Sequence, residues 1–288
     1  MNSQASQSSS DLGINVLYGL AYVIVLYIGI AVGEAMYLSL TAMWKDRVEL
    51  FPDTYASGST MHTAVQNPTN PNAKTIYVSD NRRNGVEFTY TMFINIKSST
   101  FSSGNESLRH ILHKGYSNAY PLMGPGIFCW GNTNTLRIYM NSFETWNTYT
   151  EVPNIPVDKW FHLTVSCKGN TLYIYINGNL KQKKSFPNNT PPYQNYGNVY
   201  LFNNRKRPLT KTLTPSLDSE TLNINVDGSV NGMVSRVYYF SYALTYSEIQ
   251  TLITVGPSTN VVSTNMSMDP YLADTWWTNL REGGKYVD

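Results

Sequence analysis

The sequence has few cysteines and few charged residues, and each shortage excludes a class of protein. Two cysteines in 288 residues, Cys129 and Cys167, do not make a disulfide framework. We interpret them as buried, reduced thiols, which suits a domain on the cytoplasmic side of a membrane. Charged residues make up 14% of the chain and the net charge is +2, so no overall field indicates nucleic-acid binding.

Catalytic patterns are missing as well. Nucleophile-elbow, P-loop and dinucleotide fingerprints do not occur in the chain. Glycoside hydrolysis needs two carboxylates that flank the sugar bond. Glu144, Glu151 and Glu220 are isolated in the sequence, and we interpret them as solvated. The expectation is a protein that is not an enzyme.

The sequence also shows no spacing of residues that is typical of metal ligands. His110 and His113 lie three residues apart in RHILHKG, where a structural or surface role is favoured over metal binding. His162 alternates with apolar neighbours and is expected to be a hydrogen-bonded sheet residue. Calcium needs clustered oxygen ligands, and the nearest approach to a cluster is Asp218, Glu220 and Asp227. We expect no cofactor, with calcium as the less favoured alternative.

One long uncharged run lies near the N-terminus. Residues 12–33 carry no charge, and as a helix these 22 residues span about 33 Å, against about 30 Å of bilayer hydrocarbon. No Lys or Arg precedes the run, which is untypical of a signal peptide. We expect a polar tail at 1–11 and a transmembrane helix at 12–44. The aromatic residues suited to its interfacial positions are Tyr18, Tyr22, Tyr27, Tyr37 and Trp44.

Three features of this helix bear on its neighbours. Gly29 and Gly33 form a GxxxG pair, which either lets two helices approach closely or reflects small residues tolerated in lipid. Glu34 is interpreted as an interfacial residue, with a position facing a partner helix as the alternative. Lys45 and Arg47 follow the run, so the positive-inside rule predicts that the larger C-terminal part lies on the cytoplasmic side.

The rest of the chain is typical of a β domain. Residues 45–75 contain several prolines and no period, and we expect a connector there. Alternation begins at EFTYTMFINIK and recurs in TLRIYMN, WFHLTVSC, TLYIYING and MVSRVYYF. Asn177-Gly178 predicts a hairpin turn, and Thr245 with Glu248 predicts the capped start of a short helix. The pattern favours a mainly β, two-sheet sandwich or jelly roll over 76–255, followed by a tail at 256–288.

Three stretches carry a family resemblance. They are FTYTMFINIK, VDKWFHLTVSCKGNTLYIYINGNL and GMVSRVYYFSYALTYSEIQTL. Together they resemble the laminin-G-like branch of the concanavalin A-like sandwich, with Trp160, His162 and Asn177-Gly178 at the positions of its strand and hairpin motif. The family often has Asp three residues after the last glycine, whereas this chain has Ser235 after Gly232, which argues against a metal role there. The resemblance implies a fold and leaves the function open.

A second resemblance concerns architecture and composition. The chain combines an N-terminal anchor, this sandwich, 22 Tyr and about one Asn in ten residues. That combination resembles membrane-associated virion proteins of large nucleocytoplasmic DNA viruses. It implies a single-pass, minor capsid component that links an inner membrane to a protein shell by protein–protein contacts. The alternative is a membrane-tethered, lectin-like module that binds glycans.

Two groups of residues are candidate contact sites. The basic run Arg205, Lys206 and Arg207 lies in an expected loop and is either a solvated insertion or a contact with acidic headgroups or an acidic partner. Trp276 and Trp277 in the tail are candidate interface anchors, whereas Trp130 and Trp160 are expected to pack in the core. The three glycosylation sequons, at Asn105, Asn188 and Asn265, are usable only if the domain faces the exterior.

Overall fold

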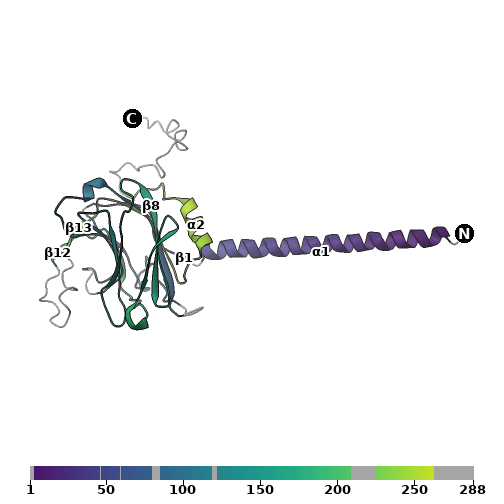
Figure 1. The fold of residues 1–288 in the computed structure, drawn as a ribbon, viewed down its shortest axis with the longest axis horizontal. Coiled ribbons are helices and arrows are strands. Elements are labelled where there is room, and N and C mark those ends of the chain that lie inside the picture. Colours follow the sequence, from purple (N-terminus) through teal and green to yellow (C-terminus); the bar gives the residue numbers. More distant parts are fainter. Residues whose placement is uncertain are drawn as a thin grey trace, which may run out of the picture. The chain divides into compact units, whose positions relative to one another are not determined.

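The computed structural model describes residues 3–45, 47–58, 60–79, 85–118, 122–208 and 225–262. The chain divides into two compact units, Met1–Asp46 and Arg47–Asp288. The first unit is a helix, and the second is a β-sandwich with one short α-helix (Figure 1).

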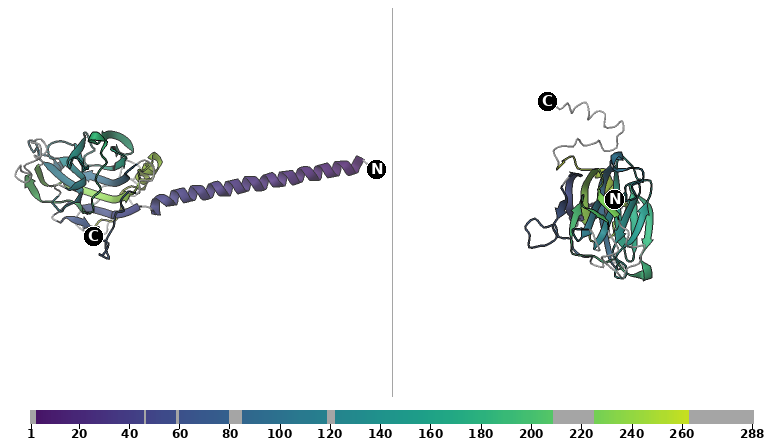
Figure 2. Two further views of the ribbon diagram at one scale, coloured as in Figure 1. Left: turned by 90° about the horizontal axis from the view of Figure 1, so that it is seen from below. Right: turned by 90° about the vertical axis from the view of Figure 1, so that its left-hand side faces the viewer.

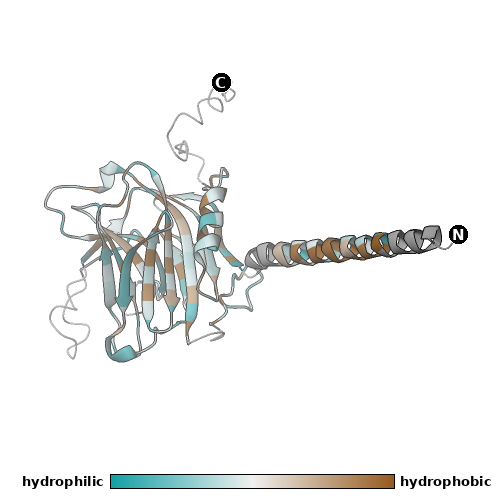
Figure 3. Ribbon diagram, turned by 45° about the vertical axis from the view of Figure 1, so that its right-hand side comes forward, coloured by the Kyte–Doolittle hydropathy of each residue, from teal (hydrophilic) through white to brown (hydrophobic). Residues whose placement is uncertain are grey.

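α1 (Ser3–Lys45) is one continuous helix of 43 residues, which includes most of the expected polar tail. Its segment Ile14–Tyr37 has 24 residues and a hydropathy of 2.2, and none of it is buried within the protein. Figure 3 shows this predominantly apolar middle of the helix. A segment of this kind is long and apolar enough to cross a bilayer, and signal sequences near an N-terminus meet the same test.

The residues expected to matter in the membrane all lie on α1. Tyr18 and Tyr22 are exposed, and the space next to Gly29 and Gly33 is open. Trp44 lies in the last turn of the helix. The helix ends at Lys45, and the first strand of the sandwich begins at Arg47.

Two sheets make up the second unit (Figure 2). In spatial order, the six-stranded sheet contains β1 (Arg47–Ala56), β14 (Gly232–Phe240), β3 (Glu87–Ile96), β8 (Trp160–Lys168), β9 (Thr171–Ile176) and β10 (Asn179–Ser185). The main path of the eight-stranded sheet contains β12 (Lys206–Pro208), β13 (Asn225–Ser229), β4 (Leu108–Gly115), β5 (Met123–Trp130), β6 (Leu136–Met140) and β7 (Thr148–Val152). Beside this path, β11 (Asn198–Leu201) pairs with β4 and with β2 (His62–Ala64).

The main hydrophobic core lies between the sheets. In β3 the alternation predicted from the sequence is confirmed, because Phe88, Tyr90, Met92, Ile94 and Ile96 all belong to this core. The predicted mainly β, two-sheet sandwich is therefore the fold of this unit. Both cysteines are buried and free, as expected.

The short elements at the edges of the sandwich follow local sequence signals. Asn177 and Gly178 have positive φ angles of 49° and 76°, as the tight turn between β9 and β10 requires. α2 (Tyr246–Val255) begins with the predicted capping box of Thr245 and Glu248. Two 3-10 turns, η1 (Ser98–Thr100) and η2 (Pro187–Asn189), complete the described secondary structure.

The structure corrects the expected connector at 45–75. This interval contains β1, an edge strand of the six-stranded sheet, and the short strand β2. β1 does not show the alternation of apolar and polar residues that marks a strand in the sequence. The reason is that its register shifts twice, between Glu49 and Phe51 and between Phe51 and Thr54. The shifts place the adjacent residues Leu50 and Phe51 both in the core.

The two ends of the sandwich differ, so we name them. The proximal end is where β3 begins and β4 ends; Phe88, Lys114, Gly124 and Met140 line one small cavity there. Arg47 at the start of β1 pairs with Phe240, which pairs with Thr89, so β1 begins toward this end. The distal end is the opposite one, where β4 begins and β5 ends.

Candidate functional site

The outer face of the eight-stranded sheet carries a second apolar cluster. Cross-strand partners share a face, and the register aligns His110 with Phe128, Phe128 with Arg137, and Arg137 with Glu151. The buried members of this outer cluster are Leu108, Met123, Phe128 and Tyr139. Trp130 and Trp146 pack against them and stay partly exposed, so aromatic rings reach the surface of this sheet.

Arg137 is the centre of this face. Its guanidinium carbon lies 4.5 Å from the Trp130 ring centre and 4.3 Å from the Tyr149 ring centre. Arg137 Nε donates to Glu151 Oε1 at 2.8 Å, and Trp130 Nε1 donates to the same oxygen at 2.8 Å. We call Trp130, Arg137, Tyr149 and Glu151 the arginine cluster.

The layer beneath holds the arginine cluster in place. Tyr139 is fully buried and accepts a hydrogen bond from Arg137 Nη1 at 3.2 Å. Burial raises the pKa of Tyr139 to about 12, so its hydroxyl stays neutral. The Phe128 ring meets Tyr139 edge-on at 5.7 Å. Because these groups are packed and hydrogen-bonded, the exposed surface above them is pre-organised.

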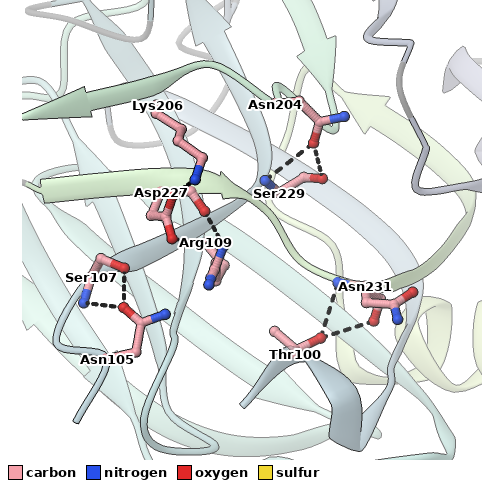
Figure 4. A network of polar contacts seen from close by, with 9 residues as sticks. All are labelled: Thr100, Asn105, Ser107, Arg109, Asn204, Lys206, Asp227, Ser229 and Asn231. Carbon is pink, nitrogen blue, oxygen red and sulfur yellow. Dashed lines mark hydrogen bonds and ion pairs between the residues drawn. The ribbon is translucent and has the colours of Figure 1, made fainter. Parts of the chain in front are cut away.

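Polar residues at the distal end form a separate network (Figure 4). The carboxylate of Asp227 pairs with Arg109 Nη1 at 3.1 Å and with Lys206 Nζ at 3.1 Å. Asn105 Oδ1 accepts from the Ser107 amide at 3.2 Å. An open hollow beside them is lined by Gly104–Ser107, Lys206 and Asn225–Asp227.

This network bears on the calcium alternative. Asp227 already faces two cationic side chains, which disfavour a divalent cation at its oxygens. Asp218 and Glu220 lie outside the described residues. Among the residues that the structure describes, no group of three or more His, Cys, Asp or Glu side chains is placed to hold a metal.

The predicted contact residues have mixed outcomes. Arg205 and Lys206 are exposed, but Lys206–Pro208 is the strand β12 and not a loop, because it pairs with β13 at the sheet edge. The backbone of Arg207 lies in that strand. Lys206 also forms an ion pair with the Asp227 carboxylate, which it shares with Arg109. Trp276 and Trp277 fall outside the described residues.

Three of the four histidines, His110, His113 and His162, are buried structural residues. The Asn203 amide donates to His110 Nδ1 at 2.9 Å, and His110 Nε2 lies 2.6 Å from His113 Nδ1. His113 Nε2 lies 2.7 Å from the carbonyl oxygen of Tyr116. All of these hydrogen bonds can form when both imidazole rings are neutral and each carries its proton on Nε2. Burial lowers the pKa of His113 to about 4 and that of His162 to about 3. As expected, His162 is a hydrogen-bonded sheet residue, with its Nδ1 3.3 Å from Thr164 Oγ1.

The arginine cluster was not predicted from the sequence. Trp130 was expected in the core but lies half-buried on the outer face, because it is out of phase with the core residues of β5. Glu151 was expected to be solvated but binds Arg137 and Trp130. The alternation in TLRIYMN and TYTEV does place Arg137, Tyr149 and Glu151 on the outer face. Trp160 is buried as expected, in a small cluster with Ala56, Phe93 and Met233.

A family comparison agrees with this architecture. The profile of the concanavalin A-like lectin/glucanases superfamily, in its laminin-G form, matches residues 70–250. The chain belongs to this superfamily. The matched range covers the sandwich from the approach to β3 into α2.

Solved structures give more distant similarities. The receptor-binding domain of botulinum neurotoxin D is 13% identical over 70% of this chain and 43% of that chain, with a TM-score of 0.44. The serotype G binding domain is 14% identical over 70% and 42% of the two chains, with a TM-score of 0.44. This chain therefore spans less than half of these proteins, and at such scores the likeness adds nothing about function. Curated protein sequences gave no match.

Proposed function

We propose that this chain is a non-enzymatic, membrane-anchored structural protein whose sandwich binds a protein partner through the arginine cluster. The observation that carries the proposal is the position of Arg137, which lies between Trp130 and Tyr149 on a partly exposed sheet face. Trp, Tyr and Arg are the residue types that dominate binding energy in protein interfaces. A pre-organised cluster of them loses little side-chain entropy when a partner binds.

We further propose that α1 holds this surface at a membrane. Ile14–Tyr37 is proposed as a single-pass anchor, with Lys45 and Arg47 holding the sandwich on the cytoplasmic side. A binding domain fixed at that surface suits a minor capsid component that links the inner membrane of a virion to its protein shell. The architecture of anchor plus sandwich supports this finer proposal.

Crosslinking mass spectrometry on native membranes or particles tests the proposal. A photoreactive residue replaces Tyr149 in one variant and Tyr175 in another; both are tyrosines with partly exposed side chains, on opposite sheets. We expect crosslinks from position 149 to one abundant coat protein and few from position 175. Equal yields at the two positions, or none to any coat protein, would contradict the proposal.

Binding of glycans is the second candidate, favoured by the hollow at the distal end. Its lining offers amide, hydroxyl and carboxylate groups from Asn105, Ser107, Glu106 and Asn225, which suit sugar hydroxyls. A glycan array probed with the full chain in detergent tests this candidate. Binding to the array that is lost in Asn225→Ala and kept in Arg137→Ala would favour glycan binding over protein binding as the function.

The side of the membrane on which the sandwich lies separates the two candidates. Asn188 begins the sequon Asn-Asn-Thr and is exposed. If the sandwich is cytoplasmic, we expect no change in mass on glycosidase treatment after expression in eukaryotic cells. A glycosidase-sensitive shift that disappears in Asn188→Gln would overturn the cytoplasmic orientation.

A further inference from the structure

The proximal end of the sandwich exposes an unusual set of large apolar side chains. Five of them are between 43% and 77% exposed: Tyr77, Val78, Tyr116, Phe143 and Tyr196. They come from four separate segments of the chain. Three of the five are tyrosines and one is phenylalanine, so the set is predominantly aromatic.

One loop, residues 190–197, brings these segments together. The Tyr193 amide donates to the Asn141 carbonyl at 2.8 Å, which places Phe143 beside the loop. The Ser79 amide donates to Gln194 Oε1 at 2.9 Å and brings Tyr77 and Val78 to the loop. Tyr196 itself belongs to it.

The same loop is fixed from below by a buried cation. Lys114, which is 3% exposed, donates from Nζ to the Gly197 carbonyl at 2.9 Å and to the Asn195 carbonyl. Asn195 Nδ2 donates in return to the Lys114 carbonyl at 2.9 Å. Gly197 also lies against the backbone of Gly115, one residue before Tyr116. The exposed aromatic groups are therefore mounted on a rigid support.

Basic side chains border this end. Lys168 ends β8 and aligns with Glu87 at the start of β3, and Lys183 and Lys184 lie near the end of β10. All three are exposed, and none forms an ion pair among the residues described. The acidic side chain of Glu144 is also exposed here, and its Oε2 accepts a hydrogen bond from Asn188 Nδ2 at 2.9 Å.

Exposed tyrosines and phenylalanine with lysines beside them match the chemistry of a lipid headgroup layer. Tyrosine rings favour the boundary between hydrocarbon and water, and lysines near an anionic leaflet gain about 1 kcal/mol each. The chain connection supplies a second argument. Nine residues, 38–46, separate the apolar segment ending at Tyr37 from Arg47, and the eight of them that continue α1 rise by only about 12 Å.

We infer that the proximal end rests on the headgroup layer of the bilayer in which α1 is anchored. The exposed aromatic groups enter the interface, and Lys168, Lys183 and Lys184 face acidic lipids. This inference depends on the proposed anchor and adds a second, peripheral contact to it. Contact at the proximal end leaves the distal hollow directed toward the solvent.

Depth-dependent quenching tests the inference on the full chain in lipid nanodiscs. Tyr196→Cys at the proximal end and Asn132→Cys at the distal end are labelled with an environment-sensitive fluorophore. Cys129 and Cys167 are buried with raised thiol pKa values, so they compete little for the label. The discs contain phosphatidylcholine and phosphatidylserine, with a spin label on the headgroup of a small fraction of the lipid.

We expect a blue-shifted emission and several-fold stronger quenching at position 196 than at position 132. Equal, weak quenching at both positions in discs that retain the protein would overturn the inference and leave the anchor intact. Loss of the protein from the discs in an alkaline wash would instead refute the anchor and with it the proposed function. If a protein partner occupies this end, position 196 stays accessible to iodide in purified discs, which also overturns the inference.

The lysines are tested separately. Lys168→Gln, Lys183→Gln and Lys184→Gln are combined in one variant, with Lys159→Gln as a matched single control. Lys183 and Lys184 lie on the edge strand β10, where their alternative role is to prevent edge-to-edge pairing of sheets. If they contact lipid, quenching at position 196 falls in the triple variant when phosphatidylserine is present. Unchanged quenching would remove the lysines from the inference.

Discussion

The two ends of the sandwich are held by different kinds of contact. At the proximal end, the buried groups of Lys114 and Asn195 fix a loop under an exposed aromatic surface. At the distal end, Asp227 pairs with Arg109 and Lys206, and the Lys206 side chain is 80% exposed. A lost contact in the buried cluster leaves polar atoms without water, whereas water replaces a lost contact at the surface. The comparison predicts a stiff proximal end and an adaptable distal end.

The largest expected contrast comes from two glycines. Gly115 at the proximal end has a φ of 153°, and a Cβ there would lie 1.8 Å from the Leu122 carbonyl oxygen. We expect Gly115→Ala to lower the free energy of unfolding by more than about 3 kcal/mol, because the backbone must move. Gly104 at the distal end has a φ of 79° and open space around it, so Gly104→Ala is expected to lose about 1 kcal/mol. Urea unfolding followed by tryptophan fluorescence measures both, and similar losses would erase the contrast.

A matched pair of asparagines gives the next largest effect. Asn195 donates to the carbonyls of Lys114 and Gly124 at 2.9 and 3.2 Å and accepts from the Gly197 amide at 2.9 Å. Asn195→Ala leaves these buried groups unsatisfied, and we expect a loss of roughly 2–4 kcal/mol. Asn105→Ala at the distal end removes a half-exposed turn contact and is expected to lose less than about 1 kcal/mol. The same urea unfolding assay measures both variants, and equal losses of unfolding free energy would contradict the expected difference.

Acid is expected to weaken the strand that joins the two ends. The neutral histidine pair of β4 links Asn203 on the distal side to Tyr116 on the proximal side. Because burial lowers the pKa of His113 to about 4, its contribution is complete above pH 6.5 and declines as pH falls toward 4. Each such histidine adds a slope of up to about 1.4 kcal/mol per pH unit in this window. His113→Gln should flatten the pH dependence of the unfolding free energy, and an unchanged slope would contradict this account.

The smallest expected effect is at the distal ion pairs. Asp227→Asn removes the carboxylate that faces the partly exposed Arg109 and the exposed Lys206. We expect a loss of about 1 kcal/mol or less, reduced further in high salt because exposed charges are screened. A loss as large as that of Asn195→Ala would show that the distal end is as tightly held as the proximal one.

The sequence predicted the strands that alternate regularly and missed those that do not. TMFINI and WFHLTVSC place one face in the core without interruption, and both were assigned correctly as strands β3 and β8. β1 contains Pro52 and two register shifts, so its buried residues do not alternate. The arginine cluster was missed for another reason: the order of β5, β6 and β7 in the sheet decides which residues meet, and no local pattern contains it.

The pairing of β1 has a consequence for how the protein is made. β1 is the first strand to leave the ribosome, yet its partner β14 begins at Gly232, and Thr54 also bridges to Val261 near the end of the described chain. The sheet therefore closes only after residue 261 has been synthesised, long after α1 has emerged. If α1 is the anchor proposed above, its insertion precedes folding of the domain, and each new sandwich assembles at the membrane surface.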